Sequence, residues 1–130
     1  YESRYNLAVS YMRVNQCQKA LDQILEAQKL VKEEEPAVYY TIGVSNTCLA
    51  DEIYEKKNED GEIEKITYED EHKAYEMATR YVDYLTKANE NFDKYINLAP
   101  NAEDSQNVLN LVAQNKEKIA EISSKYLPQQ

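Results

Sequence analysis

Residues 4 to 31 read RYNLAVSYMRVNQCQKALDQILEAQKLV, and this stretch decides the fold. Two short apolar stripes with helical spacing flank an interruption at residues 14–16. Small side chains let two antiparallel helices approach closely, and large ones fill the space beside them. The stretch therefore predicts a closely packed helical hairpin. The stripes consist of Leu7, Ala8 and Tyr11 before the interruption, and of Ala20, Ile24 and Ala27 after it.

The composition favours helices throughout the chain. Its 130 residues include only two Gly and three Pro, and 42% of them are hydrophobic. Gly and Pro are the usual residues of hairpins and tight turns, so this content argues against an all-β fold. The length fits one all-α domain, 1–130. Tyr1 already lies within helical pattern, so we expect the chain to be a piece of a longer protein.

Five helices and one insertion are expected. The insertion, at about 56–67, breaks the helical period and contains Asp60-Gly61, a dipeptide typical of hairpin turns. It predicts an exposed acidic loop or a small two-stranded hairpin. The helices are expected at residues 2–14, 16–32, 36–54, 68–98 and 102–126.

The helix at 68–98 carries an unbroken heptad seam. The seam residues are spaced by four and three alternately, which is the spacing of helices that pack along their length. A break near Val82-Asp83 would divide this helix in two, but the intact seam favours one continuous rod. The helix at 102–126 has one apolar stripe and one polar face, as a capping helix needs. The seam consists of Ala74, Ala78, Tyr81, Leu85, Ala88, Phe92 and Tyr95.

The order of residues in the opening hairpin resembles a tetratricopeptide repeat. The shared features are a large apolar residue followed by a small one, Tyr three further on, and then Ala, a bulky residue and Ala in the second helix. This first repeat spans 1–34. A second, interrupted repeat spans 36–101: Tyr39, Ile42 and Gly43 open it, Asn46 stands where the family prefers Tyr, and the NLAPN stretch at 97–101 is similar to the family's helix exit.

The resemblance implies a superhelix of antiparallel helical hairpins whose first helices line a concave, peptide-binding face. On that face the family grips a terminal carboxylate with Lys, Asn and Arg, which are absent from the matching positions here. An apolar or aromatic anchor is therefore the expected ligand feature. The alternative is that so few repeats form no deep groove and that the residues of this face pack on the helix at 68–98. The candidate peptide-binding residues are Tyr5, Val9 and Met12 in the first helix and Tyr40, Val44 and Thr47 in the third.

The charge distribution bears on partners. The net charge is −9, and residues 51–71 hold ten acidic and three basic side chains, so seven of the nine excess negative charges lie there. Such a segment repels nucleic acid and anionic membrane surfaces and favours a protein partner with a basic surface. No apolar run is long enough to span a membrane, so no membrane insertion is expected.

Candidate sites for chemistry are weak in this sequence. Cys17 and Cys48 are expected to be buried free thiols, although helices antiparallel around Glu34 would bring them to similar heights, and a disulfide is the alternative. His72 is expected to be a solvated surface residue. The stretch at 58–63 resembles part of a calcium loop, but Lys56 would occupy its first ligand position.

No nucleophile motif and no glycine-rich phosphate loop is present, so neither an enzyme, a cofactor nor a metal site is predicted. The sequence instead predicts a non-catalytic module that binds a protein or peptide. The alternative is an oligomerisation domain that forms a homodimer through the seam of the helix at 68–98. The compartment is left open by the sequence.

Overall fold

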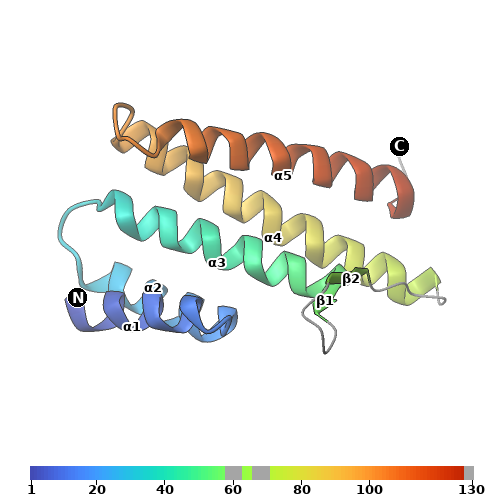
Figure 1. Ribbon diagram of the computed structural model, residues 1–130, viewed down its shortest axis with the longest axis horizontal. Helices are drawn as coiled ribbons and strands as arrows, with labels where there is room; N and C mark the ends of the chain where they lie inside the picture. The colour runs from blue at the N-terminus through green and yellow to red at the C-terminus, as the bar shows by residue number, and fades with distance from the viewer. Residues whose placement is uncertain (58–62, 66–70, 128–130) are drawn as a thin grey trace.

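The computed structural model describes residues 1–57, 63–65 and 71–127. Across these residues it is all-helical apart from one pair of three-residue strands (Figure 1), which confirms the predicted all-α class. The β-hairpin turn and the calcium-like stretch predicted at 58–63 lie largely outside the described residues. The elements are α1 (Glu2–Arg13), α2 (Cys17–Leu30), α3 (Pro36–Tyr54), β1 (Glu55–Lys57), β2 (Ile63–Lys65), α4 (Glu71–Leu98) and α5 (Ser105–Tyr126).

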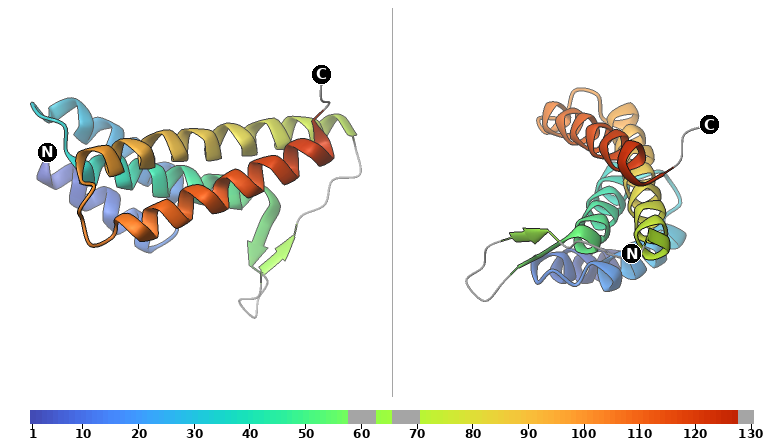
Figure 2. Two further views of the ribbon diagram at one scale, coloured as in Figure 1. Left: turned by 90° about the horizontal axis from the view of Figure 1, so that it is seen from above. Right: turned by 90° about the vertical axis from the view of Figure 1, so that its right-hand side faces the viewer.

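Consecutive helices run antiparallel and alternate between two layers. Figure 2 shows α1, α3 and α5 on one side of the molecule and α2 and α4 on the other. The central helix α3 packs against both α2 and α4, and α5 packs on α4. We call the layer of α1, α3 and α5 the front layer, since it faces the viewer in Figure 1.

The turn between α1 and α2 has a specific local cause. Asn15 adopts a φ of 59°, a left-handed conformation that asparagine tolerates better than most residues. The N–H of Gln16 donates to the carbonyl of Tyr11 (2.9 Å), and the N–H of Asn15 donates to that of Met12 (3.1 Å). These two bonds form a Schellman motif, which satisfies carbonyls that the helix end would otherwise leave unpaired.

The small-residue stripes of the first hairpin form a core cluster with α3. Ala8, Ile24 and Ala27 are fully buried and pack with Val38 and Ile42. The prediction for the first stripe is wrong at its edges. Leu7 is 40% exposed, and Tyr11 is only half-buried, since α1 has no helix packed on its outer side.

α3 and α4 approach each other closely at Gly43. A Cβ atom built at this position would lie 2.5 Å from the ring of Phe92, closer than packed carbon atoms approach. Because Gly43 has no side chain, the Phe92 ring can occupy this space, and Phe92 is 1% exposed. A glycine inside a helix costs about 1 kcal/mol relative to alanine, and burial of the aromatic ring offsets this cost.

The long helix α4 is continuous from Glu71 to Leu98, without the break considered near Val82-Asp83. All seven residues of its predicted seam are buried. α5 begins at Ser105, three residues later than expected, and buries Val108, Val112 and Asn115 of its predicted stripe. None of the described helices combines the length and the apolar character required to cross a bilayer.

The insertion contains a short hairpin. β1 and β2 pair antiparallel, with Glu55 opposite Lys65 and Lys57 opposite Ile63. The two-stranded alternative is therefore the one found among the described residues of the insertion.

The prediction of free cysteines is wrong. Cys17, the first residue of α2, forms a disulfide with Cys48 of α3. Their Cα atoms are 6.0 Å apart, within the range of about 4.4–6.8 Å that disulfides span. The antiparallel arrangement of α2 and α3 brings the two residues to the same height, across 31 positions of sequence. The bond ties the first hairpin to α3.

Candidate peptide-binding face

The α1 half of the predicted face is a half-buried stripe. Tyr5, Val9 and Met12 follow one another at spacings of four and three, so they share one side of α1. Tyr5 packs at the margin of the α1–α2–α3 core cluster, and its ring stacks on that of Tyr1 with centroids 6.0 Å apart. The Met12 sulfur accepts a hydrogen bond from the Ser45 hydroxyl of α3 (3.4 Å). The stripe thus touches α3 on one edge and reaches solvent on the other.

On α3, Tyr40 lies at the surface, and its ring packs on aromatic side chains of α4. Its side chain is 38% exposed. Its ring centroid lies 5.6 Å from that of Tyr95 and 6.1 Å from that of Phe92, in tilted geometries that aromatic pairs favour. Tyr40 therefore packs on α4, as the alternative prediction for this segment had it, while keeping part of its ring in solvent.

Val44 and Thr47 lie under α5. Val44 packs against a core cluster that includes Phe92 of α4 and Val108 of α5. The Thr47 hydroxyl accepts a hydrogen bond from the Asn115 side chain of α5 (3.5 Å). The C-terminal helix thus contacts the second half of the α3 stripe, which is half-buried, and sequence reasoning did not foresee this contact.

A buried amide network fixes α5 in this place. Asn115, 2% exposed, donates to the side-chain oxygen of Asn89 on α4 (3.1 Å), and Asn89 donates to the carbonyl of Val112 (3.3 Å). Further along, Lys118 of α5 lies 3.7 Å from Asp51 of α3. Buried amides are costly when unpaired, so this network favours one alignment of α5 on α3 and α4.

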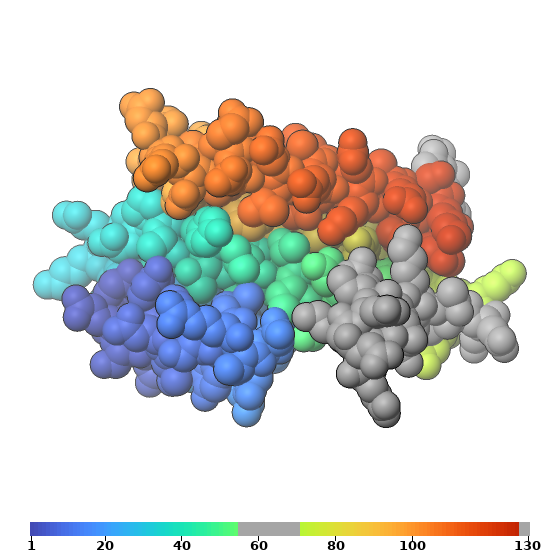
Figure 3. Space-filling model, in the orientation of Figure 1, coloured from blue at the N-terminus to red at the C-terminus, as the bar shows by residue number. Residues whose placement is uncertain are grey.

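The part of the predicted face that stays accessible to solvent lies where α3 runs between the first hairpin and α5. Figure 3 shows α3 as a band between the first hairpin and α5. We call this surface the front face and define it by the four predicted residues that still reach solvent there without contacts to α5. They are Tyr5, Val9, Met12 and Tyr40.

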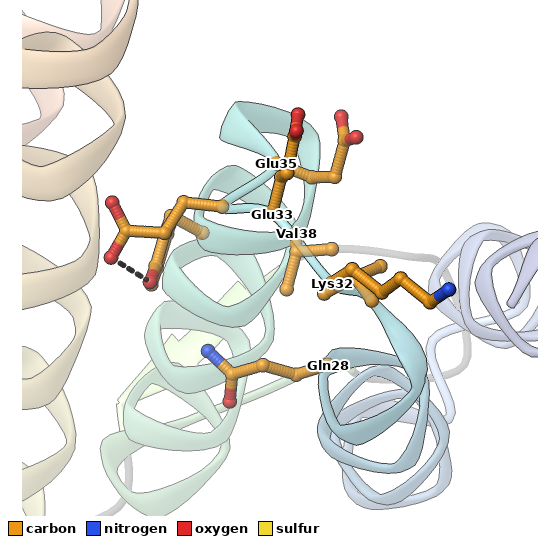
Figure 4. A pocket seen from close by; sticks show the side chains of 8 residues that line it. Gln28, Lys32, Glu33, Glu35 and Val38 are labelled. Carbon is orange, nitrogen blue, oxygen red and sulfur yellow. Dashed lines mark hydrogen bonds between the residues drawn. The ribbon is translucent and has the colours of Figure 1, made fainter.

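A small cavity lies where α2 passes into α3 (Figure 4). Its volume is about 170 Å³, below the roughly 300 Å³ at which pockets for small organic ligands begin. Its lining mixes three successive glutamates and one lysine with two valines and one tyrosine. It is lined by Gln28, Val31, Lys32, Glu33, Glu34, Glu35, Val38 and Tyr39.

The one perturbed group in that lining is Tyr39. Burial, and then the hydrogen bond that its hydroxyl donates to Glu34 (3.2 Å), raise the pKa of this phenol above its ordinary value of 10.0. Such a group stays protonated at neutral pH and offers neither a base nor a nucleophile. The cavity is a packing feature of the α2–α3 connection.

His72 is a surface residue, as predicted. Its side chain is 80% exposed, and its Nε2 lies 3.1 Å from Glu76 one helical turn later. This arrangement is a surface pair on α4 and is distant in sequence from the front face.

Sequence reasoning missed one cluster of side chains that could bind a metal ion. The sulfurs of Cys17 and Cys48 and a carboxylate oxygen of Glu52 all lie within 4.8 Å of one another. Partial burial raises the pKa of the Glu52 carboxyl. The spacing of Cys48 and Glu52, four residues apart on one helix, was a signal in the sequence. The contribution of Cys17 required the tertiary fold.

Comparison of the chain with protein-family models, with curated proteins and with solved structures finds no match. Its function therefore has to be inferred from its own residues.

Proposed function

We propose that this chain is a non-catalytic module of the tetratricopeptide type that binds a protein or peptide on its front face. One observation carries the proposal: aromatic and aliphatic side chains of α1 and α3 reach solvent together on one layer of alternating helical hairpins. The front helices of such hairpins are the binding helices in the family that the sequence resembles. Tyrosine and methionine are well suited to protein interfaces, because they bury a large area.

Binding would work through a few anchors. The Tyr40 ring is already supported by Tyr95 and Phe92, so it loses little conformational freedom when a partner covers it. The four residues of the front face carry no charge, which favours an apolar or aromatic partner side chain over a terminal carboxylate. The net charge of −9 would favour partners with basic surfaces around that anchor.

The alternative of a homodimer through the α4 seam has less support. The seam residues, including Leu85 and Phe92, are buried within the chain against α3 and α5. A dimer that used them would have to displace these helices. Sedimentation equilibrium across a concentration series tests the alternative, which predicts a mass that rises toward twice that of the monomer.

The experiment for the front face uses peptides selected by display on the immobilised protein, with affinities measured by calorimetry. We expect Tyr5→Ala combined with Tyr40→Ala to weaken binding by about 30-fold or more, as loss of a hot spot of 2 kcal/mol does. Tyr75→Ala is the matched control, because Tyr75 is 47% exposed on α4 in the other layer. Circular dichroism checks that all variants remain folded. Equal affinities of the double variant and the control would exclude the front face.

A further inference from the structure

The Cys17–Cys48 pair joins the first residue of α2 to α3. Cys17 begins α2, where the unpaired N–H groups and the helix dipole stabilise negative charge. It is 1% exposed, whereas Cys48 on α3 is half-buried. The thiolate is the form of cysteine that binds metals and attacks disulfides.

Glu52 completes a three-ligand cluster. It follows Cys48 by four residues, so both side chains project from the same side of α3. Its carboxylate is within 4.8 Å of both sulfurs. Glu52 is exposed and Cys48 is half-buried, so two of the three ligands are accessible from solvent.

We propose that, when the Cys17–Cys48 bond is reduced, Cys17, Cys48 and Glu52 bind a divalent cation of the zinc type. Zinc combines thiolate and carboxylate ligands at about 2.0–2.3 Å and accepts water as a fourth ligand. Two thiolates and one carboxylate carry three negative charges, and the dication offsets two of them. The two thiols release their protons to solvent as the metal binds.

The metal site and the disulfide exclude each other. Forming the disulfide removes two electrons and two protons from the two thiols, and a small-molecule disulfide that accepts them leaves as two free thiols. The oxidised pair then has no thiolate to offer. The site therefore binds the metal only in the reduced protein, and it is independent of the front face.

The test uses the full chain, reduced and handled without oxygen, and cobalt(II) as a spectroscopic substitute for zinc. We expect thiolate-to-cobalt charge-transfer absorption that saturates at one cobalt per chain and disappears on addition of zinc. After treatment with a small-molecule disulfide the same protein should show no such absorption. A reduced protein without charge-transfer bands would overturn the proposal.

Two variants separate a built site from general attraction of cations to an acidic protein. Glu52→Gln keeps the cysteines and should weaken zinc binding by about tenfold or more, because it removes one of three ligands. Asp51→Asn is the matched control, because Asp51 is next to Glu52 but lies near Lys118 of α5. Equal weakening by both variants would exclude Glu52 as a ligand.

Protection of the cysteines provides a readout that does not depend on variants. Zinc should slow alkylation of Cys17 and Cys48 by iodoacetamide in the reduced wild-type chain, and Glu52→Gln should diminish this protection. Alkylation rates that zinc leaves unchanged would contradict the proposed site even if cobalt binds elsewhere.

Discussion

The first hairpin and the three long helices use different means to hold together. The contact of α1 and α2 with α3 rests on alanines, two isoleucines, one valine and the Cys17–Cys48 bond. The contacts among α3, α4 and α5 rest on aromatic rings and a buried amide network. Aromatic side chains bury far more area than alanine, so the long helices have the larger core. The first hairpin depends more on its covalent link.

Replacement of Phe92 should have the largest effect. Phe92→Ala removes a ring that is 1% exposed and should lower the free energy of unfolding by about 3–5 kcal/mol. Urea unfolding followed by circular dichroism measures the change. Gly43→Ala should cost about 1–3 kcal/mol in the wild type through overpacking against the ring. It should cost less in the Phe92→Ala background; an equal cost would show that the ring does not restrict position 43.

Removal of the disulfide tests the weaker region. Replacing both cysteines by serine opens a loop of 31 positions and should lower the free energy of unfolding by about 2–4 kcal/mol. The loss should concentrate in α1 and α2, whose amide hydrogens should exchange faster while those of α4 keep their protection. A uniform loss of protection would show that the two regions unfold together.

The amide network should contribute less to the free energy of unfolding than either the Phe92 ring or the disulfide. Asn115→Ala leaves Asn89 without its side-chain partner and should cost about 1–3 kcal/mol in urea unfolding. The double variant with Asn89→Ala should cost less than the sum of the single variants, since the two residues bond to each other. Additive costs would argue against the network as the feature that aligns α5.

Alkaline pH should have a small, graded effect centred on the long helices. Burial raises the pKa of Tyr39 and of Tyr95 above the ordinary 10.0, and the charge of Asp104 adds to the rise at Tyr95. Above about pH 10 the unfolded chain loses these protons first, so stability that is present below that pH falls as the pH rises. Combining Tyr39→Phe with Tyr95→Phe should reduce this fall between about pH 9 and pH 11, measured by urea unfolding.

Much of the fold follows from local pattern, because helix faces are encoded by spacing. The stripe of Ala20, Ile24 and Ala27 was predicted and is fully buried, and so is the seam of α4. Spacing does not say what covers a face. Leu7 has the spacing of a packing residue but is exposed, because no helix lies outside α1. The partial burial of Val44 against α4 and α5 depends on helix–helix alignment, which no local period specifies.

Gly43 has no side chain, whereas its neighbours on α3 do, and this difference affects how the long helices align. The Phe92 ring occupies the space that a side chain at position 43 would fill, and α3 has no other glycine. Sliding α4 by one turn would remove the Phe92 ring from this notch and press it against larger residues. The contact between Gly43 and Phe92 therefore fixes the axial register of α4 on α3. Residues could be added at the outer ends of α4 without shifting the part of the helix that packs on α3.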